Sequence, residues 1–327
     1  MDCLFRPVQA QFKRTIERLP SALVNANPGH TIAIRNLTKR YGDQLAVDDL
    51  TLEIEEGSVC GHLGPNGAGK TTAFKSLLGL LRPTSGTFEV LGAPVTPATF
   101  ESLAFVPERN DLYEWMTVGE HLALARRTYK NFDSKRAAEL GALLKIDSRK
   151  KIKRLSKGQQ SAVALTLAFA FRPRVLVLDE PSSGLDPIFQ RVVLDLIIDA
   201  AAGGATVLFS SHQVGQVERA ADRVAILKNG KLVLDGNLDT IKGEEKIVEA
   251  VFEQAAIAPN GLASDPRVRR IESNGRVLRA YVRSDAAGVV QVLEAHNPKA
   301  VSVYDLSLED IFLGAVTGPA NAYGEAS

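Results

Sequence analysis

Cysteine is scarce in this sequence, with only Cys3 and Cys60 among 327 residues. Two cysteines this far apart are too few for a disulfide framework or a zinc cluster. We therefore expect the chain to work in a reducing compartment. Cys60 lies in the apolar run SVCGHL, where it is best interpreted as a small core residue.

Long hydrophobic runs are also missing. No window holds about 18 or more uninterrupted apolar residues, the length that a membrane-spanning helix needs. The N-terminus carries charges where a secretion signal needs its apolar segment. We therefore expect neither a membrane span nor that signal. Residues 4–24 have an amphipathic pattern, which we interpret as a surface helix or extension in preference to a membrane anchor.

The sequence also lacks an excess of charge of either sign. The sequence has 39 basic and 38 acidic residues, which gives a net charge of +1. No global electrostatic field points to nucleic acid or to an anionic membrane. We therefore expect no nucleic-acid partner, and other partners must be inferred from individual sites.

The composition is that of a well-packed globular protein, long enough for one large domain and a smaller one. Changes of pattern along the chain predict an N-terminal extension over residues 1–30, a large α/β domain over 31–243 and a small α+β domain over 244–316. The last residues, 317–327, have the composition of a disordered tail.

The stretch GPNGAGKTT, residues 64–72, fits the phosphate-loop pattern G-x-x-x-x-G-K-[ST]. Its glycines allow backbone N–H groups to close around the α and β phosphates of a nucleotide. Lys70 then reaches the β and γ phosphates, and the Thr71 hydroxyl ligates Mg²⁺. An apolar run, residues 58–63, precedes the loop and a helical pattern, residues 70–81, follows it. This order of strand, loop and helix makes the site credible.

Hydrophobic periodicity predicts the elements around this loop. Alternating patterns predict antiparallel strands, continuous apolar runs predict buried strands, and an Asn-Gly pair predicts a hairpin turn. Capping-box pairs, Thr117 with Glu120 and Ser156 with Gln159, mark the beginnings of two helices. The expected strands are 31–37, 46–54, 58–63, 175–180 and 205–212, with a helical insert over 117–171 and a hairpin over 223–236.

Two further motifs accompany the phosphate loop: RLSKGQQ at residues 154–160 and VLVLDEPSSGLDP at residues 175–187. Together the three resemble the ATP-binding cassette family, with its Walker A loop, signature loop, Walker B strand with adjoining glutamate, and D-loop. Tyr41 and His212 stand where that family has an adenine-stacking aromatic and a switch histidine. The resemblance covers residues 31–243. It implies an α/β fold, a P-loop NTPase core with an antiparallel β subdomain and a helical subdomain, to which the small α+β C-terminal domain is added.

The resemblance also implies the cofactors and the residues that bind them. ATP and Mg²⁺ are the expected cofactors, and ATP hydrolysis is the expected reaction. Two cassettes of the family pair head to tail, so Ser156 of the signature loop is expected to cap the ATP of a second subunit. The expected nucleotide-binding residues are Tyr41, Gly64, Asn66, Gly67, Gly69, Lys70, Thr71, Thr72, Glu108, Ser156, Gly158, Gln159 and Asp186.

Asp179 and Glu180 follow a buried strand, and each has an expected role. Asp179 can hold Mg²⁺ through its hydration shell, and Glu180 can polarise the water that attacks the γ phosphate. His212 is expected to contact that phosphate and help to position the water. We therefore predict Glu180 and His212 as catalytic residues, and Thr71, Asp179 and Glu108 as metal ligands. Taken alone, the two carboxylates could be a solvated strand edge and His212 a helix cap.

Two positions depart from the family pattern. Lys157 replaces the first glycine of the usual signature loop, which adds a Cβ and a positive charge where a phosphate would approach. Glu108 stands where the family usually has the glutamine of its Q-loop. A carboxylate there can still accept a Mg²⁺-bound water, but it adds negative charge near the phosphates. These departures leave the turnover rate open and keep a regulatory, low-activity cassette as one alternative.

The expected partners also follow from the resemblance. Residues 110–118, which include Trp115 and Met116, lie where the family docks its membrane subunit, although helical-subdomain core is an equal interpretation. SLEDIFL, residues 307–313, is similar to the tail of the multidrug and antibiotic exporter branch. We therefore expect the nucleotide-binding subunit of an exporter, paired with a second cassette subunit and a separately encoded permease, at the cytoplasmic face of the membrane. A soluble cassette ATPase acting on ribosomes or DNA is the alternative.

Overall fold

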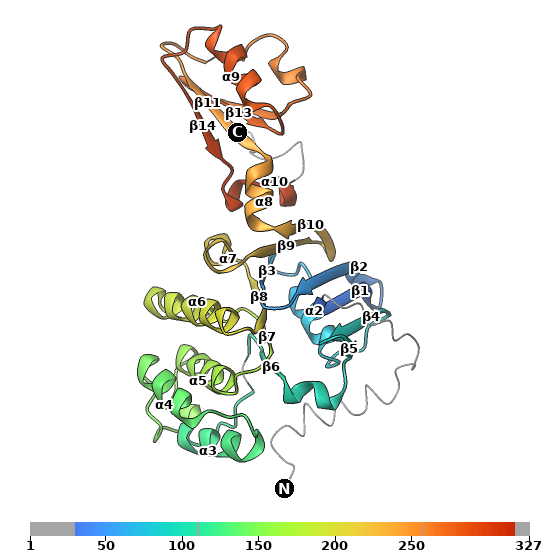
Figure 1. The fold of residues 1–327 in the computed structure, drawn as a ribbon, viewed down its shortest axis with the longest axis vertical. Coiled ribbons are helices and arrows are strands. Elements are labelled where there is room, and N and C mark those ends of the chain that lie inside the picture. The colour runs from blue at the N-terminus through green and yellow to red at the C-terminus, as the bar shows by residue number, and fades with distance from the viewer. Residues whose placement is uncertain (1–29, 110, 257, 318–327) are drawn as a thin grey trace. The chain divides into compact units, whose positions relative to one another are not determined.

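A computed structural model of the chain describes residues 30–109, 111–256 and 258–317. It divides into two compact units, one ending at Asp235 and the other beginning at Gly236 (Figure 1). Helix α8 (Leu238–Glu244) therefore belongs to the second unit, whereas the sequence pattern places the boundary after residue 243. The amphipathic segment 4–24 and the predicted tail from residue 318 onward lie outside the described residues.

The first unit contains two sheets, of which one is antiparallel with the strand order β2-β1-β4-β5. Ile32 and Ile34 on β1 pair with Ile54 and Leu52 on β2, and all four side chains are buried in the core. The two alternating strand patterns are thereby confirmed, while β4 and β5 have no predicted counterpart. The strands are β1 (His30–Tyr41), β2 (Gln44–Glu55), β4 (Ser85–Val90) and β5 (Ala93–Pro94).

The other sheet has six strands in the order β10-β9-β3-β8-β7-β6. β3 pairs in parallel with β8 and β9, and β7 pairs in parallel with β6 and β8. β3, β7 and β8 are buried along their whole length, as their continuous apolar runs predict. Asn229 and Gly230, both with positive φ, form the predicted hairpin turn. The strands are β3 (Val59–Leu63), β6 (Leu103–Val106), β7 (Val175–Leu178), β8 (Thr206–Ser211), β9 (Arg223–Lys228) and β10 (Lys231–Asn237).

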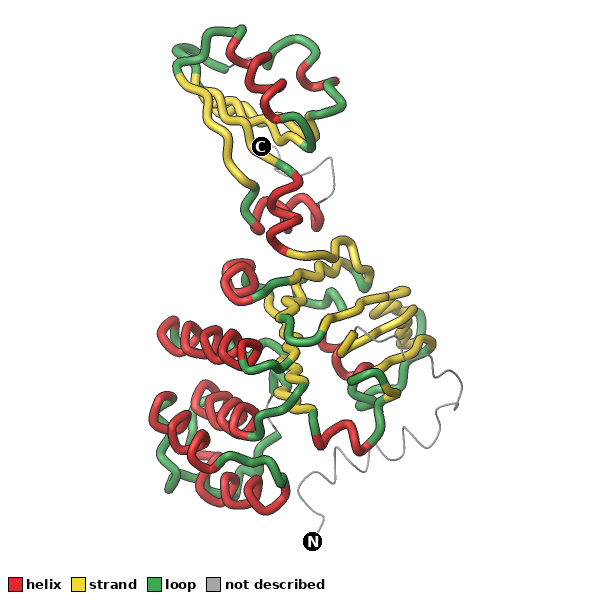
Figure 2. The backbone as a smooth tube through the Cα atoms, in the orientation of Figure 1, coloured by secondary structure: helices red, strands yellow, loops and turns green. Residues whose placement is uncertain are grey.

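The helices of the first unit include the predicted helical insert, because α3, α4 and α5 contact one another (Figure 2). Capping boxes at Thr117 and Ser156 begin α3 and α5, as predicted. Helix α6, which begins at an Asp186 cap, has no predicted counterpart. The helices are α2 (Lys70–Leu77), α3 (Val118–Thr128), α4 (Ser134–Leu143), α5 (Lys157–Ala170), α6 (Pro187–Ala202) and α7 (Val214–Ala220).

The helix predicted over residues 70–81 is shorter in the structure, because α2 ends at Leu77. Gly79 has a φ of 67°, and its N–H donates to the Ser76 carbonyl oxygen at 3.0 Å. A glycine in the left-handed region ends a helix because it turns the chain aside while still satisfying a free carbonyl group. The apolar residues beyond Gly79 extend the sequence pattern but not the helix.

The second unit has its own sheet and its own core. Its four antiparallel strands lie in the order β12-β13-β11-β14. Val289 and Leu293 of α9 pack with Val248 and Leu278 of the sheet, and all four are buried. The unit is therefore of the α+β type. Its further elements are β11 (Lys246–Val251), β12 (Val268–Asn274), β13 (Val277–Val282), α9 (Ala286–Glu294), β14 (Ala300–Asp305) and α10 (Leu308–Thr317).

His62 lies on β3, at the centre of the parallel sheet and just before the phosphate loop. Its side chain is fully buried, and neither ring nitrogen has a hydrogen-bond partner among the described residues. The ring contacts Phe74 of α2, with the two centroids 5.4 Å apart. Burial, together with the positive charge of Lys70, lowers the pKa of His62 to about 3. The imidazole is therefore neutral in the folded protein above that pH.

We predict that His62 makes the protein less stable in mild acid. Below about pH 6.5, the unfolded chain takes up a proton at this histidine that the folded chain does not. The free energy of unfolding should therefore fall by about 1.4 kcal/mol for each pH unit below that value. His62→Leu removes this dependence and also removes two buried nitrogens without partners, so it should raise stability at neutral pH.

Urea unfolding of both proteins at about pH 7.5 and about pH 5.5 measures the effect. His296→Leu, at an exposed histidine, is the matched control. An equal loss of stability in acid for the wild type and for His62→Leu would show that another group is responsible.

Candidate active site

The phosphate loop, residues 64–69, joins the end of β3 to the start of α2. Gly67 and Gly69 have φ values of 81° and 106°, in the region that residues with a side chain rarely adopt. Space is also limited: a Cβ on Gly69 would lie 2.5 Å from the Ala46 carbonyl oxygen, and one on Gly64 would lie 2.7 Å from that of Leu227. Glycine is therefore required here by backbone shape and by packing.

Lys70 is the first residue of α2, and its side chain is only 7% exposed. Its Nζ donates to the Gly64 carbonyl oxygen at 2.6 Å and lies 3.6 Å from Glu180 Oε1. A buried cation needs such partners because desolvation penalises an isolated charge. The remaining loop and helix residues that the motif predicts differ in burial: Asn66 is exposed, while Thr71 and Thr72 are half-buried.

Asp179 and Glu180 follow β7 at the carboxyl edge of the parallel sheet. Asp179 is 1% exposed, and its Oδ1 accepts a hydrogen bond from Ser210 Oγ at 2.7 Å. The same hydroxyl accepts a hydrogen bond from the Glu180 backbone N–H at 2.9 Å. Ser210 belongs to β8, so one buried hydroxyl fixes both acidic residues to the neighbouring strand. Sequence reasoning missed Ser210, although its place at the polar end of an apolar strand was a usable signal.

Glu180 links the phosphate loop to His212. Its Oε1 faces Lys70, and its Oε2 lies 2.9 Å from His212 Nδ1. The Glu180 side chain is 11% exposed, whereas that of His212 is 46% exposed, so the carboxylate is shielded while the imidazole reaches solvent. The backbone φ of Glu180 is 50°, a conformation that costs a residue with a side chain on the order of 1–3 kcal/mol. The structure therefore joins Lys70 and His212 through the Glu180 carboxylate.

Asp179 also carries the observation that fits a metal site. Its Oδ2 is buried and has no hydrogen-bond partner among the described residues. An isolated buried carboxylate oxygen is costly, and Mg²⁺ is commonly bound by one or two carboxylates together with substrate phosphates. Thr71, a second expected ligand, lies one residue after Lys70. Glu108, the third, is exposed on the loop after β6, and within the described ranges no hydrogen bond or ion pair joins it to Asp179.

The signature loop forms the beginning of α5. Ser156 Oγ accepts a hydrogen bond from the Gln159 N–H at 3.2 Å, and Gln159 Oε1 accepts one from the Ser156 N–H at 3.1 Å. A Cβ on Gly158 would lie 2.9 Å from the Gly184 carbonyl oxygen, so this glycine lets α5 approach the loop after β7. Lys157 is exposed beside it. These residues surround an exposed helix N-terminus, where anions are favoured.

Tyr41 and Asp186 lie on other elements. Tyr41 ends β1 and is 48% exposed, and the Lys39 ammonium lies 4.7 Å from the centre of its ring. Asp186 caps α6 by accepting hydrogen bonds from the N–H groups of Ile188 and Phe189 at 3.0 Å. In the part of the chain that the structure describes, no hydrogen bond joins Tyr41 or Asp186 to Lys70, Glu180 or His212. One chain therefore brings together only part of the predicted set.

The loop that contains the single tryptophan combines buried and exposed side chains. Trp115 is 67% exposed, whereas Met116 is buried, so the interpretation of the whole segment as core is wrong for Trp115. His121 holds the loop in place, since its Nε2 accepts from the Tyr113 N–H at 3.1 Å and its Nδ1 lies 3.0 Å from the Thr117 carbonyl oxygen. Burial lowers the pKa of His121, which favours the neutral ring that both contacts require.

A buried polar cluster beside His212 was not apparent in the sequence. Gln216 Oε1 accepts hydrogen bonds from Ser182 Oγ at 2.6 Å and from Ser211 Oγ at 3.0 Å. Gln216 Nε2 donates to Gln213 Oε1 at 2.9 Å. Ser182 lies in the loop after β7 and Ser211 ends β8, so the cluster ties these two segments together next to the contact between Glu180 and His212.

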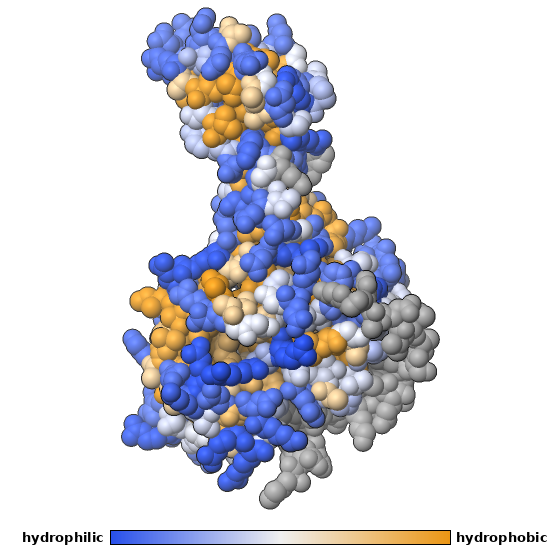
Figure 3. All heavy atoms as spheres, viewed as in Figure 1, coloured by the Kyte–Doolittle hydropathy of each residue, from blue (hydrophilic) through white to orange (hydrophobic). Residues whose placement is uncertain are grey.

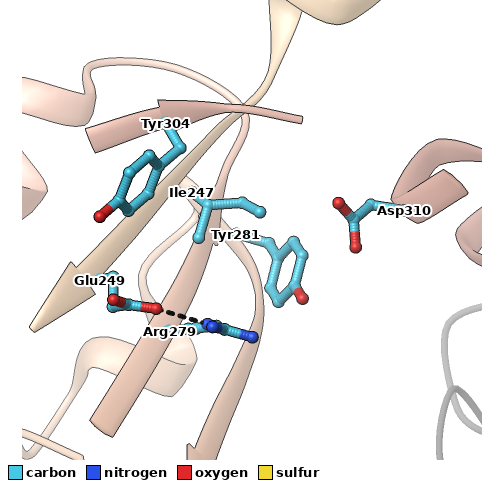
Figure 4. A pocket seen from close by; sticks show the side chains of 6 residues that line it. All are labelled: Ile247, Glu249, Arg279, Tyr281, Tyr304 and Asp310. Atoms are coloured by element: carbon cyan, nitrogen blue, oxygen red, sulfur yellow. Dashed lines mark hydrogen bonds and ion pairs between the residues drawn. The ribbon is translucent and has the colours of Figure 1, made fainter. Parts of the chain in front are cut away.

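A separate hollow of about 350 Å³ lies in the second unit (Figure 4). Glu249 and Arg279 form an ion pair of 2.7 Å within it, and the rings of Tyr281 and Tyr304 lie on either side of Ile247. None of the site residues predicted from the sequence belongs to this hollow. Its lining residues are Ile247, Glu249, Arg279, Tyr281, Tyr304 and Asp310.

A glycine-rich loop between a parallel strand and a helix, with an acidic pair after another parallel strand of the same sheet, defines the class of P-loop nucleoside triphosphatases. Comparison with known proteins narrows the class. A family model described as ABC transporter matches residues 47–183, which include the phosphate loop, the signature loop and the acidic pair. A model described as an AAA domain, putative AbiEii toxin of a type IV toxin–antitoxin system, matches residues 151–217.

Individual proteins give longer matches. An uncharacterised ABC transporter ATP-binding protein of Methanocaldococcus jannaschii is 35% identical over 291 residues, which cover 86% of this chain and 98% of the relative. The Nod factor export ATP-binding protein I of Rhizobium meliloti is 31% identical over 307 residues, which cover 88% of this chain and 89% of the relative. A solved structure of an ATP-binding subunit of an ABC transporter has a TM-score of 0.60 and 30% identity, covering 65% of this chain and 92% of that chain.

The chain belongs to the ATP-binding subunits of ABC transporters, which are ATPases. The family resemblance of the motifs and the predicted P-loop NTPase fold are thereby confirmed. Among the described residues, no helix combines the length and the apolar character that crossing a bilayer demands.

We predict that Ser210→Ala slows ATP hydrolysis by roughly ten- to a hundredfold, because both acidic residues lose the hydroxyl that fixes them. The unfolding free energy should also fall by about 1–3 kcal/mol, since the Glu180 N–H and Asp179 Oδ1 lose a buried partner. Steady-state ATPase kinetics would measure kcat and KM separately. Ser210→Thr, which keeps the hydroxyl, should recover much of the rate, and Ser183→Ala, at an exposed serine, is the control. An unchanged kcat in Ser210→Ala would contradict a positioning role.

Proposed function

We propose that this chain is the ATP-hydrolysing subunit of an exporter, that it pairs head to tail with a second cassette, and that it drives a separately encoded membrane permease. The relative from Rhizobium meliloti is named as an export protein and aligns over most of both chains, which supports the exporter assignment. The relatives are ATP-binding proteins of ABC transporters, so the comparisons give no support to a soluble ATPase acting on ribosomes or DNA.

The observation that carries the hydrolytic mechanism is the contact of Glu180 with both Lys70 and His212. Glu180 is shielded and oriented, as a residue must be to accept a proton from an attacking water. His212 holds one carboxylate oxygen and is exposed, so its free Nε2 is available to a γ phosphate. Lys70 exchanges the Gly64 carbonyl oxygen and Glu180 for phosphate oxygens when a nucleotide binds. This exchange frees Glu180 Oε1 for the water.

The backbone of residues 64–69 supplies the N–H groups for the α and β phosphates, with the side chains of Thr71 and Thr72 beside them. Asp179 Oδ2 and the Thr71 hydroxyl would hold Mg²⁺, which neutralises developing charge on the phosphates. Glu108 would reach the Mg²⁺ ion only if the exposed loop that carries it moved toward the phosphates. Lys70, Asp179, Glu180 and His212 therefore form the part of the site that lies within one chain.

The second half of the site comes from a second cassette in this proposal. Ser156, Gly158 and Gln159 lie at an exposed helix N-terminus, which is ready to receive an anion. Lys70 does not belong to this half, because its ammonium group is held in the phosphate loop of the same chain. Head-to-tail pairing would bring the Ser156 helix of one subunit to the ATP of the other, and Lys157 would add a positive charge there. Tyr41 would stack on the adenine, and Asp186 would shape the loop between the subunits.

We predict that Glu180→Gln binds ATP but loses hydrolysis by on the order of 100-fold or more, since the amide cannot accept the proton of the water. ATP-bound protein should therefore accumulate as a dimer. Size-exclusion chromatography with and without Mg-ATP measures this, alongside ATPase assays.

Glu139→Gln, at an exposed carboxylate on α4, is the matched control and should behave like the wild type. A Glu180→Gln protein that stays monomeric with ATP and still hydrolyses it would remove Glu180 from the catalytic role.

We also predict that the loop with Trp115 docks on the permease at the cytoplasmic face of the membrane. An exposed tryptophan on an anchored loop is the kind of side chain that dominates protein interfaces. Trp115→Ala should therefore lower co-purification with the permease by about tenfold or more and lower transport, while ATP hydrolysis by the isolated subunit is unchanged. Tyr304→Ala, at an exposed aromatic residue of the second unit, is the control. Full co-purification of Trp115→Ala with the permease would show that the docking site lies elsewhere on the chain.

A further inference from the structure

The small net charge of the chain conceals a strongly basic segment. Residues 118–157, which span α3, α4 and the start of α5, contain twelve Lys or Arg and four Asp or Glu, a net charge of +8 in a chain whose total is +1. Asp111 and Glu114 of the preceding loop reduce this excess to +6. The remainder of the chain is therefore acidic. A global charge count cannot reveal such a separation, and the expectation that nucleic acid is not a partner rested on that count.

The four acidic residues of this segment are engaged locally. Glu120 Oε2 accepts hydrogen bonds from the backbone N–H and the hydroxyl of Thr117, and Asp133 caps α4 and pairs with Arg172 at 2.8 Å. These contacts lower the pKa of both carboxyl groups. The other two acidic residues, Glu139 and Asp147, lie in ion pairs with Arg136 and Arg149.

The cations, in contrast, are exposed and crowded. Six of them, which we call the basic surface, are Lys145, Arg149, Lys150, Lys151, Lys153 and Arg154. Within the described ranges, Lys150, Lys151, Lys153 and Arg154 form no ion pair. Strongly hydrophilic side chains cover the region of α3 and α4 on the face seen in Figure 3. The six lie within residues 145–154, and like charges this near in the sequence repel one another unless an anionic partner or counter-ions compensate them.

The basic surface is tied to the loop that carries Trp115. The Lys153 N–H donates to the Glu114 carbonyl oxygen at 3.1 Å, the Ile152 N–H donates to that of Met116 at 2.9 Å, and the Val118 N–H donates to that of Lys150 at 3.0 Å. The loop that carries the exposed tryptophan is therefore hydrogen-bonded, through its backbone, to the segment that carries the exposed cations. Tryptophan and lysine together are the side chains that favour the interface between water and lipid.

We propose that the basic surface contacts anionic phospholipid headgroups of the bilayer that houses the permease. The proposal rests on the proposed function, because docking on a permease through the Trp115 loop brings this surface to the membrane. A cluster of four to eight Lys and Arg is typical of proteins that bind acidic lipids, each contributing about fivefold to binding. Among the described residues of the helical insert and the Trp115 loop, Trp115 is the one exposed aromatic side chain, with the half-buried Tyr113 ring beside it at 5.8 Å. These two rings offer no long row on which successive RNA bases would stack, which favours the membrane over nucleic acid.

The test uses the full-length protein without any permease. It is mixed with vesicles of phosphatidylcholine alone, or with about one third phosphatidylglycerol, and sedimented at about 0.1 M salt and at about 0.5 M salt. We expect binding to the anionic vesicles only, and its loss at the higher salt concentration. The variant Lys150→Gln, Lys151→Gln, Lys153→Gln should bind roughly a hundredfold more weakly.

The matched control removes three exposed cations elsewhere: Lys75→Gln, Arg276→Gln, Arg283→Gln. It has the same net charge as the test variant and should bind like the wild type. Both variants should keep the ATPase rate and thermal midpoint of the wild type, since none of the six residues belongs to the nucleotide site. ATPase activity also reports the proposed function separately, so loss of vesicle binding with full hydrolysis concerns the lipid proposal alone.

Three outcomes would overturn the proposal: equal binding to neutral vesicles, binding that the test variant retains, or tighter capture of an RNA of about 20 nucleotides than of anionic vesicles. The second outcome would assign membrane binding to another part of the chain, such as the basic residues that precede residue 30. The third would assign the basic surface to nucleic acid.

Discussion

The rest of the site depends on the contacts that the Glu180 carboxylate makes with Lys70 and His212. One of its oxygens faces Lys70, which the phosphate loop delivers from β3, and the other faces His212, which follows β8. This arrangement requires β3, β8 and β7 to be adjacent and parallel, because only then do their carboxyl ends meet at one edge. The buried apolar strands and the left-handed glycines of the loop therefore serve one result: a cation and an imidazole that contact the two oxygens of one carboxylate.

Holding these groups in place has a cost that the surrounding structure must offset. Glu180 has a left-handed backbone, Asp179 keeps one buried oxygen without a partner among the described residues, and His62 has two such nitrogens. Neutral hydrogen bonds supply much of the support: Ser210 fixes the acidic pair, and Gln216 joins the segments after β7 and β8. Neutral groups suit this task because they orient the charged residues without changing the charge that a nucleotide meets.

Local patterns predicted the parts of the fold that have strong hydrophobic periodicity or that depend on particular residue types, such as helix caps and tight turns. The strands around the phosphate loop, the capping boxes of α3 and α5 and the Asn229-Gly230 turn follow from residue type and spacing. Helix α6 and strands β4 and β6 were not predicted, because tertiary packing determines the secondary structure of segments whose pattern is short or mixed. Helix α2 is shorter than predicted because the chain turns aside at Gly79. The motifs predicted Lys70, Glu180 and His212, which the structure joins. They did not include Ser210, whose place at the polar end of an apolar strand was the only signal, or Gln216, because the role of a serine or glutamine depends on the partner that folding places opposite it.

Charge illustrates the same limit at a larger scale. A sum over the chain treats the +8 of residues 118–157 as cancelled, although the compensating acids lie in other parts of the sequence. Interactions between exposed charges fade over a Debye length of about 8–10 Å, so a partner responds to the local surface and not to the total. Arg154 precedes Ser156 by two residues, and the neighbouring Lys153 is bonded to the loop of Trp115. The segment of residues 145–156 therefore carries exposed cations and the signature serine, and backbone hydrogen bonds join it to the loop of the exposed Trp115. The local charge that a partner meets at any of these three places is basic, although the total charge of the chain is close to zero.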